Sequence, residues 1–331
     1  MRIGILGAGA VGARAVRQAS ATAAVDEVLV ADARPDVAAR VAAAIHTKVH
    51  AVPATSLDHA DVVVLAIPAP QAPVAELHVR AGQAVVATSD DWDDTEALLA
   101  LDVLADDRAT ALVVGAAFAP GLSCLLARHA AASLDTVDEV HVAKHGTGGP
   151  ACARQHHRAL AGTARSWHDG RWLVRPAGSG RELCWFPDPV RAMDCYGAEV
   201  PDPLLLLPYF RDVERVSARM SATRRDRFTA RLPMLRPPHP EGGLGAIRVE
   251  VRGTRGGARA IDVLGAMDRA GIAAGAVAAV AAVEVAAPRL RTGAFGLADP
   301  SLPTDRLLSE LARRGVKAAR FVGSHGTSAT W

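Results

Sequence analysis

The chain has 331 residues, a length that suggests two domains and is sufficient to bury a substantial core. Half of the residues are hydrophobic and 22% are charged, a balance typical of globular proteins. Because 37 basic and 35 acidic side chains give a net charge of only +2, the sequence excludes a strong electrostatic footprint for nucleic acid or anionic membrane. Four cysteines in a chain of this length do not form a disulfide framework, so we expect a reducing cytoplasm.

The N-terminal residues predict an α/β fold with a doubly wound parallel sheet of the Rossmann type. Short apolar runs alternate with helical patterns, the signature of βαβ units. The expected strands are Arg2–Leu6, Glu27–Ala31, Val49–Val52, Asp61–Ile67, Ala84–Thr88 and Thr110–Val114. The expected helices include Val11–Ala23, Pro35–Ala44 and Leu122–Ser133. We therefore assign residues 1–134 to a dinucleotide-binding domain.

Residues 135–331 predict a second, α+β domain built on a mainly antiparallel sheet for substrate binding and dimerisation. The expected strands there are 136–143, 171–175, 214–223, 246–252 and 317–322. Helices are expected at 150–167, at 304–314 and in an alanine-rich run from about 268, while 204–207 reads as a compact segment between prolines. That run carries Glu284 and is short for a bilayer span, so we expect a buried helix and no membrane segment. About 40 residues at the end are expected to pack back on the first domain.

A glycine fingerprint follows the first strand and opens the first helix. Gly7 permits a tight turn, Gly9 lets the backbone approach a pyrophosphate, and Gly12 allows close packing of helix on strand. The phosphates would lie at the helix N-terminus, where free N–H groups and the dipole favour an anion. Alternatively, these glycines serve only as turn residues and bind no cofactor.

An acidic residue at the end of the second strand bears on the choice of cofactor. Asp32 has the position expected for a carboxylate that binds the adenosine ribose and would repel a 2′-phosphate. Arg34 could instead stack on adenine or pair with a 2′-phosphate, so NAD is only slightly favoured over NADP. Further cofactor contacts are expected from Ala10, Val11, Ala33, Ile67, Pro68, Thr88, Ser89, Phe118 and Gly121.

Three segments and the glycine fingerprint resemble the saccharopine dehydrogenase-like NAD(P)-dependent oxidoreductases. These segments are Thr88–Asp91, Gly115–Ser123 and Leu311–Val316. The resemblance implies an N-terminal Rossmann domain and a C-terminal α/β domain that carries substrate and dimer contacts. It also implies hydride transfer between a nicotinamide and a carbon bonded to nitrogen in an amino-acid-like substrate.

A second glycine-rich turn, at residues 146–149, precedes the helix expected from Pro150. Its residues Gly146, Thr147, Gly148 and Gly149 expose backbone N–H groups that could bind a carboxylate or phosphate. Hydride transfer to an imine, or from an amine, needs a group that delivers or removes a proton and a group that binds the substrate carboxylate. Lys144, His145 and His157 are the candidates for proton transfer, and Arg154 is the candidate clamp. Alternatively, these side chains are solvent-exposed groups at a strand end and on a helix face, without a catalytic role.

Aromatic residues are scarce except between Trp167 and Phe210. Trp185 and Tyr196 in this stretch could form a substrate pocket wall, a subunit interface or an ordinary sheet core. No metal site is predicted, because the cysteines lack short paired spacings. Asp90 and Asp91 follow the fifth strand, where a dehydrogenase places residues near the nicotinamide, but they are also good N-caps for the following helix, and capping is the preferred interpretation. Cys124 is interpreted as structural.

The sequence thus predicts an NAD(P)-dependent oxidoreductase that acts at a C–N centre of a small carboxylated metabolite. The expected assembly is a homodimer that binds neither nucleic acid nor membrane. One alternative is a sugar- or inositol-type or hydroxy-acid dehydrogenase acting on C–O; inositol-type enzymes carry a Lys-Pro dipeptide where this chain has Thr88-Ser89. A second alternative is a dinucleotide-binding sensor without catalytic activity.

Overall fold

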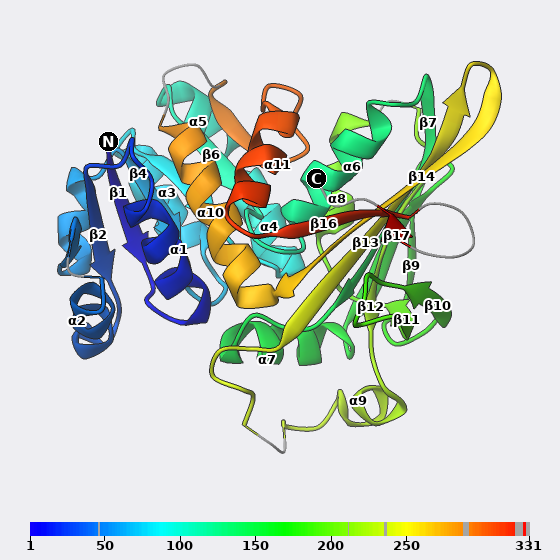
Figure 1. The fold of residues 1–331 in the computed structure, drawn as a ribbon, viewed down its shortest axis with the longest axis horizontal. Helices are drawn as coiled ribbons and strands as arrows, with labels where there is room; N and C mark the ends of the chain where they lie inside the picture. Colours follow the sequence, from blue (N-terminus) through cyan, green and yellow to red (C-terminus); the bar gives the residue numbers. More distant parts are fainter. Residues whose placement is uncertain (46, 211, 235–236, 287–290, 322–326, 329–331) are drawn as a thin grey trace.

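The computed structural model describes residues 1–331 except 46, 211, 235–236, 287–290, 322–326 and 329–331. Two β-sheets lie side by side in it, with helices covering both faces of the first and one long helix near their junction (Figure 1). This arrangement confirms the predicted fold class.

The first sheet is parallel throughout and has the strand order β15-β6-β5-β4-β1-β2-β3. Its strands are β1 (Arg2–Leu6), β2 (Glu27–Ala31), β3 (Val49–Ala51), β4 (Val62–Leu65), β5 (Ala84–Ala87), β6 (Ala111–Val114) and β15 (Gly293–Gly296). The helices between them are α1 (Ala10–Ser20), α2 (Pro35–Ala43), the 3-10 helix η1 (Ala54–His59), α3 (Ala72–Arg80), α4 (Trp92–Leu99) and α5 (Asp102–Asp107). The six predicted strands form in the doubly wound order, and β15 adds a seventh from far along the chain.

The second sheet is mainly antiparallel, with one parallel pairing, between β12 and β7. Its strands are β7 (Thr136–His145), β8 (Thr163–His168), β9 (Arg171–Pro176), β10 (Glu182–Trp185), β11 (Ala192–Gly197), β12 (Arg215–Ser221), β13 (Leu244–Arg255), β14 (Ala258–Arg269), β16 (Lys317–Phe321) and β17 (Thr327–Ser328). The associated helices are α6 (Leu122–Ala131), α7 (Pro150–Ala159), α8 (Asp202–Leu206), η2 (Leu207–Tyr209), α9 (Arg224–Thr229) and α11 (Thr304–Arg313).

Two expectations for this region were wrong. The helix from Pro150 ends at Ala159, and the residues expected to complete it form β8, which pairs with β9 and β12. The run of leucines at 204–207 is helical, in α8 and η2, where a compact segment between prolines was expected. Strands β10, β11 and β14 were not anticipated, because polar residues interrupt their alternation.

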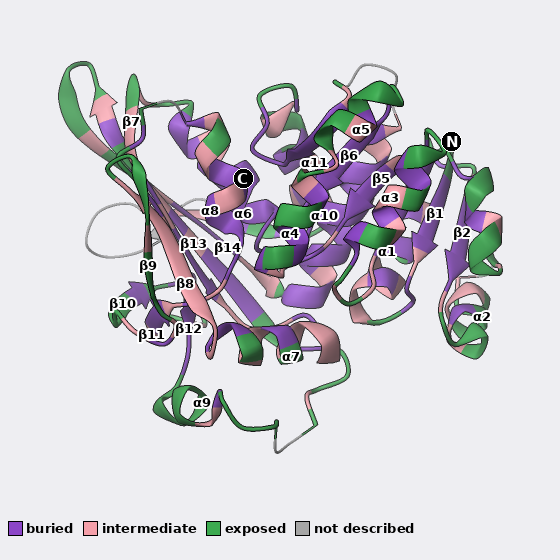
Figure 2. Ribbon diagram, turned by 180° about the vertical axis from the view of Figure 1, so that it is seen from behind, coloured by how far each residue is buried: buried purple, intermediate pink, exposed green. Residues whose placement is uncertain are grey.

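The alanine-rich run forms α10 (Ala270–Val285), which is buried on nearly all sides, as Figure 2 shows. It packs against α1 and strands of the parallel sheet, and its N-terminus continues from β14. A Cβ on Gly275 would lie 2.6 Å from the Cβ of Arg14, so small residues are needed for this close helix contact. No helix within the described residues is long and apolar enough to cross a bilayer.

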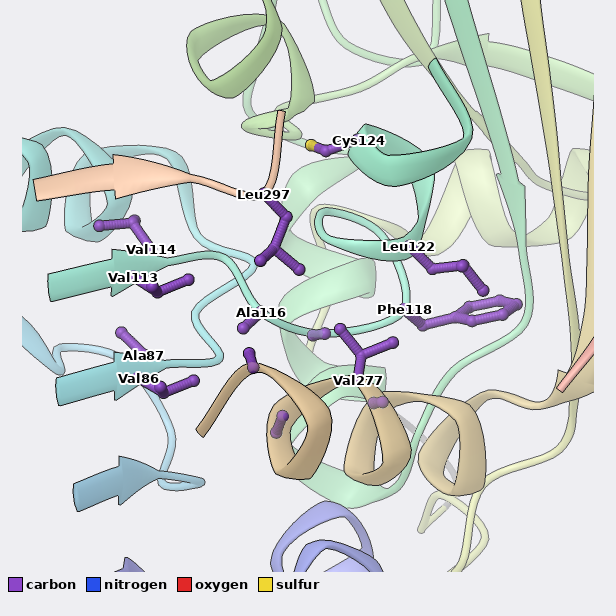
Figure 3. Close-up of a cluster of buried hydrophobic side chains, with 14 of the residues drawn as sticks. Val86, Ala87, Val113, Val114, Ala116, Phe118, Leu122, Cys124, Val277 and Leu297 are labelled. Carbon is purple, nitrogen blue, oxygen red and sulfur yellow. The ribbon is translucent and has the colours of Figure 1, made fainter. Parts of the chain in front are cut away.

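The core is continuous across the junction of the two sheets. Figure 3 shows Val86 and Val113 of the parallel sheet, Phe118 and Leu122 after β6, and Val277 of α10 in one buried cluster. The predicted boundary at 134/135 remains a proposal. The C-terminal segments go to both parts, since β15 pairs with β6 and β16 pairs with β14.

Candidate functional site

A cleft of about 380 Å³ lies at the carboxyl ends of the parallel strands, where the second sheet meets the first. Its walls come from the loops after β1, β2, β4, β5 and β6, from the end of β7 with the start of α7, and from the start of α10. This is the position at which doubly wound sheets bind dinucleotides, and the volume is within the range of small-molecule pockets.

The glycine loop at the cleft has the geometry expected for pyrophosphate binding. Gly7 has φ +101°, and a Cβ on Gly12 would lie 1.8 Å from the carbonyl oxygen of Gly7. A Cβ on Gly9 would meet no atom within 4 Å, so there is open space directly over the N-terminus of α1. The residues present therefore fit a dinucleotide phosphate group.

Asp32 ties the glycine loop to the end of β2. Its Oδ2 accepts a hydrogen bond from Ala8 N at 2.8 Å, and its Oδ1 accepts one from Arg34 N at 2.9 Å. The Arg34 side chain is exposed at the cleft rim. Each Asp32 oxygen retains acceptor capacity for a ribose hydroxyl, while Arg34 is free to meet a 2′-phosphate.

The glycine-rich turn brings a second helix N-terminus onto the first. A Cβ on Gly149, the N-cap of α7, would lie 2.6 Å from the Cβ of Ala10. Gly148 approaches Gly271 at the start of α10. Because the N-termini of α1 and α7 converge here, their dipoles both favour an anion at this end of the cleft.

Lys144 is the basic group that reaches the cleft from β7. The residue is 6% exposed, and its Nζ donates to the Ala119 carbonyl oxygen at 3.3 Å. The same nitrogen lies 4.0 Å from Oδ2 of Asp90, after β5. An ammonium thus lies between the two halves of the protein, next to the loops expected near the nicotinamide.

The structure separates the two aspartates that were both expected to be caps. Asp91 is the N-cap of α4 and accepts from Asp94 N, whereas Asp90 faces Lys144. Burial raises the pKa of Asp90, although the nearby Lys144 ammonium opposes this shift. Capping was the preferred interpretation for Asp90, and its contact with Lys144 was not predicted because that residue lies 54 positions away, on another sheet.

Two residues of α7, Cys152 and Gln155, make further polar contacts with Asp90 and Asp91. The Cys152 thiol donates to Asp90 Oδ2 at 3.3 Å, and burial raises the pKa of Cys152 to about 12, so the thiol is protonated at neutral pH. Gln155 donates to Asp91 Oδ2 at 2.7 Å. Neither contact was predictable from the sequence, since neither residue is part of a recognisable motif.

Two arginines of α7 line the cleft at i, i+4 spacing. Arg154 and Arg158 are both exposed, and neither makes an ion pair with a described carboxylate. Nη2 of Arg158 donates a hydrogen bond to Oε1 of Gln155 at 2.7 Å. Unpaired guanidinium groups at a cleft rim are suited to bind carboxylates or phosphates.

Most of the predicted site residues line one cleft. These are Gly7, Gly9, Ala10, Val11, Asp32, Ala33, Arg34, Ile67, Pro68, Thr88, Ser89, Phe118, Lys144, Gly146, Gly148, Gly149 and Arg154. Gly12, Gly121 and Thr147 are beside it but outside its lining. Gly12 and Gly121 shape its turns, as Gly121 has φ +122° and has no room for a Cβ.

The other candidates lie elsewhere. His145 is adjacent to Lys144 on β7 and therefore faces the opposite side of the sheet, where its Nδ1 lies 2.8 Å from Ser221 Oγ. His157 Nε2 donates to the Leu232 carbonyl oxygen at 2.9 Å, outside the cleft lining. Neither histidine therefore lines the cleft.

The aromatic stretch does not form the cleft wall. Tyr196 is buried under the Arg227 guanidinium, which lies 4.1 Å from its ring centroid, and Trp185 is 57% exposed on β10. Trp172 packs edge-on against Trp92 of α4 at 5.6 Å and so connects the β8–β9 hairpin to the first sheet's helices. Within the described part of the chain, no cluster of three or more potential ligands could hold a metal ion. Burial raises the pKa of Cys124 to about 12, as expected for a structural thiol.

Comparison with known proteins agrees with this geometry. Residues 2–91 match the family model described as NADP oxidoreductase coenzyme F420-dependent. A search of the curated proteins found no match.

Solved structures match over nearly the whole chain. Saccharopine dehydrogenase (L-Glu forming) from Saccharomyces cerevisiae superposes with a TM-score of 0.70 at 15% identity, covering 97% of this chain and 100% of that one. Amine dehydrogenase from Mycobacterium smegmatis gives 0.52 at 12% identity, over 89% and 94% of the two chains. C. glutamicum DAP dehydrogenase, solved with DAP, gives 0.51 at 16% identity, over 93% and 98%.

These matches confirm the predicted resemblance at the level of fold. The chain therefore has the fold of saccharopine dehydrogenase, and its residues 2–91 are similar to the family described as NADP oxidoreductase coenzyme F420-dependent.

Proposed function

We propose that this protein is an NAD(P)-dependent oxidoreductase that transfers a hydride between the nicotinamide and a C–N centre of a small, amino-acid-like carboxylated metabolite. The observation that carries the proposal is the position of Lys144. Its buried ammonium enters the cofactor cleft from the second sheet, beside Asp90 and opposite the glycine loop.

The cofactor would be held by residues that already have the required geometry. The open space over Gly9 and the N-terminus of α1 would take the pyrophosphate, and Asp32 or Arg34 would meet the adenosine ribose or its phosphate. When bound, the nicotinamide supplies or accepts the hydride. Thr88, Ser89 and Phe118 line the same cleft as Lys144 and would enclose the nicotinamide end.

Reduction of an imine to an amine needs one proton on nitrogen as well as a hydride on carbon. Nζ of Lys144 holds protons within reach of the cleft and is oriented by the Ala119 carbonyl oxygen at 3.3 Å. Asp90, which accepts a hydrogen bond from the Cys152 thiol, stabilises the ammonium. After transfer, the neutral amine of Lys144 would take up a new proton from solvent that enters the cleft.

Arg154 would bind the substrate carboxylate. It is the first unpaired arginine of α7 and lines the same cleft as Lys144, and the turn at 146–149 adds backbone N–H groups. A bidentate guanidinium fixes the orientation of a carboxylate and thereby the face that is presented to the nicotinamide. This supports a substrate that carries a carboxylate next to the reacting carbon.

The test is turnover with a panel of 2-oxo acids, each supplied with reduced cofactor and either with or without an amine. We expect nicotinamide oxidation only when the amine is present, with NADH and NADPH compared in parallel. Oxidation by 2-oxo acids alone would favour the C–O alternative. Tight cofactor binding with no turnover on any substrate would favour the sensor alternative.

Two further expectations accompany the proposal. All four cysteines are free thiols in the structure, which supports a location in the reducing cytoplasm. We also propose that the active protein is a homodimer.

A further inference from the structure

A basic arm projects from the second sheet beside the cleft. The arm comprises residues 224–234, beginning with α9, and it connects toward β13 (Figure 1). It carries the most exposed large apolar side chain among the described residues, Phe228, at 84%. Arg224, Arg225 and Arg231 are also exposed, and none of them pairs with a described carboxylate.

The arm is fixed to its own chain by its inner side. The Arg227 guanidinium stacks on the Tyr196 ring at 4.1 Å, Ala230 is buried, and the Leu232 carbonyl oxygen accepts from His157 Nε2 at 2.9 Å. A capping box between Thr223 and Asp226 defines its first turn. Phe228 and Arg225 are exposed on this segment, and Figure 2 shows most of α9 in the exposed colour.

An acidic groove lies on the other side of α7. This groove, of about 600 Å³, is bordered by α3, α4 and Arg158 of α7. Its acidic residues are Glu76, Asp91, Asp93 and Asp94, and its apolar residues include Pro73, Ala97 and Leu101. Asp93 is exposed and makes no ion pair with a described residue.

One carboxylate in the groove is buried and only half satisfied. Asp94 is 5% exposed, and its Oδ1 accepts from Gln71 N and Ala72 N at 2.8 and 2.9 Å. Its Oδ2 has no hydrogen-bond partner among the described residues. Asp94 thus adds a third aspartate to the groove lining, beside Asp91 and Asp93.

We propose that the arm of one copy of this chain docks into the acidic groove of a second copy, and that two such contacts form a symmetric dimer. The groove offers negative charge over an apolar floor, and the arm offers arginines around a single exposed phenylalanine, so the two surfaces are complementary. Leu77 on α3 and Val103 on α5, 68% and 71% exposed, add apolar surface on helices around the groove.

The positions of the two surfaces fit a two-fold contact. Consecutive residues of α7 touch both of them, since His157 holds the arm and Arg158 borders the groove. A two-fold axis requires the same surface patch on both copies, so arm and groove must lie on one face. The inner contacts of the arm keep Phe228 from turning into the groove of its own chain.

The test is sedimentation equilibrium of the full chain at low ionic strength, with charge reversals on each side. We expect Arg225→Glu and Asp93→Arg each to raise the dimer dissociation constant at least about tenfold, because each reversal acts in both contacts. Phe228→Ser should also weaken the dimer. Arg259→Glu and Asp58→Arg reverse exposed charges outside the arm and groove and should leave the constant unchanged.

Mixing the two single variants gives the decisive result. In a mixed dimer, an acidic arm meets a basic groove and a native arm meets a native groove, so we expect dimerisation to return to near the native level. A monomer at all concentrations, or a dimer that neither reversal weakens, would overturn the proposal. Restoration only when both changes are in one chain would also overturn it, since the contact would then be within a single chain.

Discussion

Nζ of Lys144, at the end of β7, lies 4.0 Å from Oδ2 of Asp90, after β5, so the two sheets meet through an ion pair inside the cofactor cleft. The two residues lie 54 positions apart in the sequence. The pair forms because the carboxyl ends of the parallel strands and the end of β7 meet at the same cleft.

Replacing Lys144 tests its role as proton carrier. Lys144→Met retains the length and apolar stem of the side chain, and we expect kcat to fall by about 10²–10⁴ because the proton on Nζ is lost. Cofactor affinity should change little, since the phosphate and ribose contacts are elsewhere. Single-turnover rates and cofactor titration measure the two quantities separately, and an unchanged kcat would remove Lys144 from the chemistry.

Two glycines of the fingerprint should respond differently to the same substitution. Gly12→Ala places a Cβ 1.8 Å from the Gly7 oxygen and should destabilise the fold by about 1–3 kcal/mol. Gly9→Ala meets no protein atom, so stability should be retained while the cofactor dissociation constant rises about 10–100-fold. Urea unfolding and fluorescence titration of both variants check this contrast. Unchanged cofactor binding in Gly9→Ala would place the pyrophosphate elsewhere.

Arg154 should act in substrate binding and not in cofactor binding. Arg154→Gln is expected to raise KM for carboxylated substrates about 10–100-fold, the effect of losing a charge-assisted bidentate contact. Arg259→Gln, an exposed arginine outside the cleft, is the matched control. Initial-rate kinetics decide the point, and a KM equal to that of the control variant would exclude the clamp.

The structure also predicts a loss of stability in acid that is centred on His156. Burial is the largest cause that lowers the pKa of His156 to about 3, and its Nδ1 has no partner among the described residues. The unfolded chain takes up the proton near the ordinary value of 6.5 whereas the folded chain does not, so stability falls as pH drops below 6.5. This residue should cost about 2 kcal/mol at pH 5 relative to pH 8.

Unfolding of His156→Gln at both pH values measures that contribution. The variant should lose less stability on acidification than the native protein. His59→Gln changes an exposed histidine and serves as the control. Equal acid sensitivity in all three proteins would contradict the assignment.

The first sheet was predictable because most of its strands are largely buried apolar runs and its helices begin at recognisable signals. Arg2–Leu6 and Glu27–Ala31 form with the predicted bounds, and Gly7, Gly9 and Gly12 come directly after β1 as expected. β15 was not predictable, because its four residues Gly293–Gly296 become a strand only by pairing with β6. The second sheet was harder, since its outer face is polar and its strands pair over long distances.

The candidate site likewise has a part that was predictable from the sequence and a part that was not. The proposed cofactor residues were chosen from local spacing, and most of them line the cleft. The distinction between Lys144 and His145 depends on which face of β7 is turned to the cleft, and the distinction between Asp90 and Asp91 depends on where α4 begins. These are tertiary properties that residue types alone do not determine.

The most direct test of the proposed reaction follows deuterium from reduced cofactor labelled at nicotinamide C4 into product. With a 2-oxo acid and an amine as substrates, the account predicts deuterium on the carbon bonded to nitrogen, in wild type and at a much lower rate in Lys144→Met. Deuterium on a carbon bonded to a hydroxyl, or none in any product while cofactor binds, would contradict it.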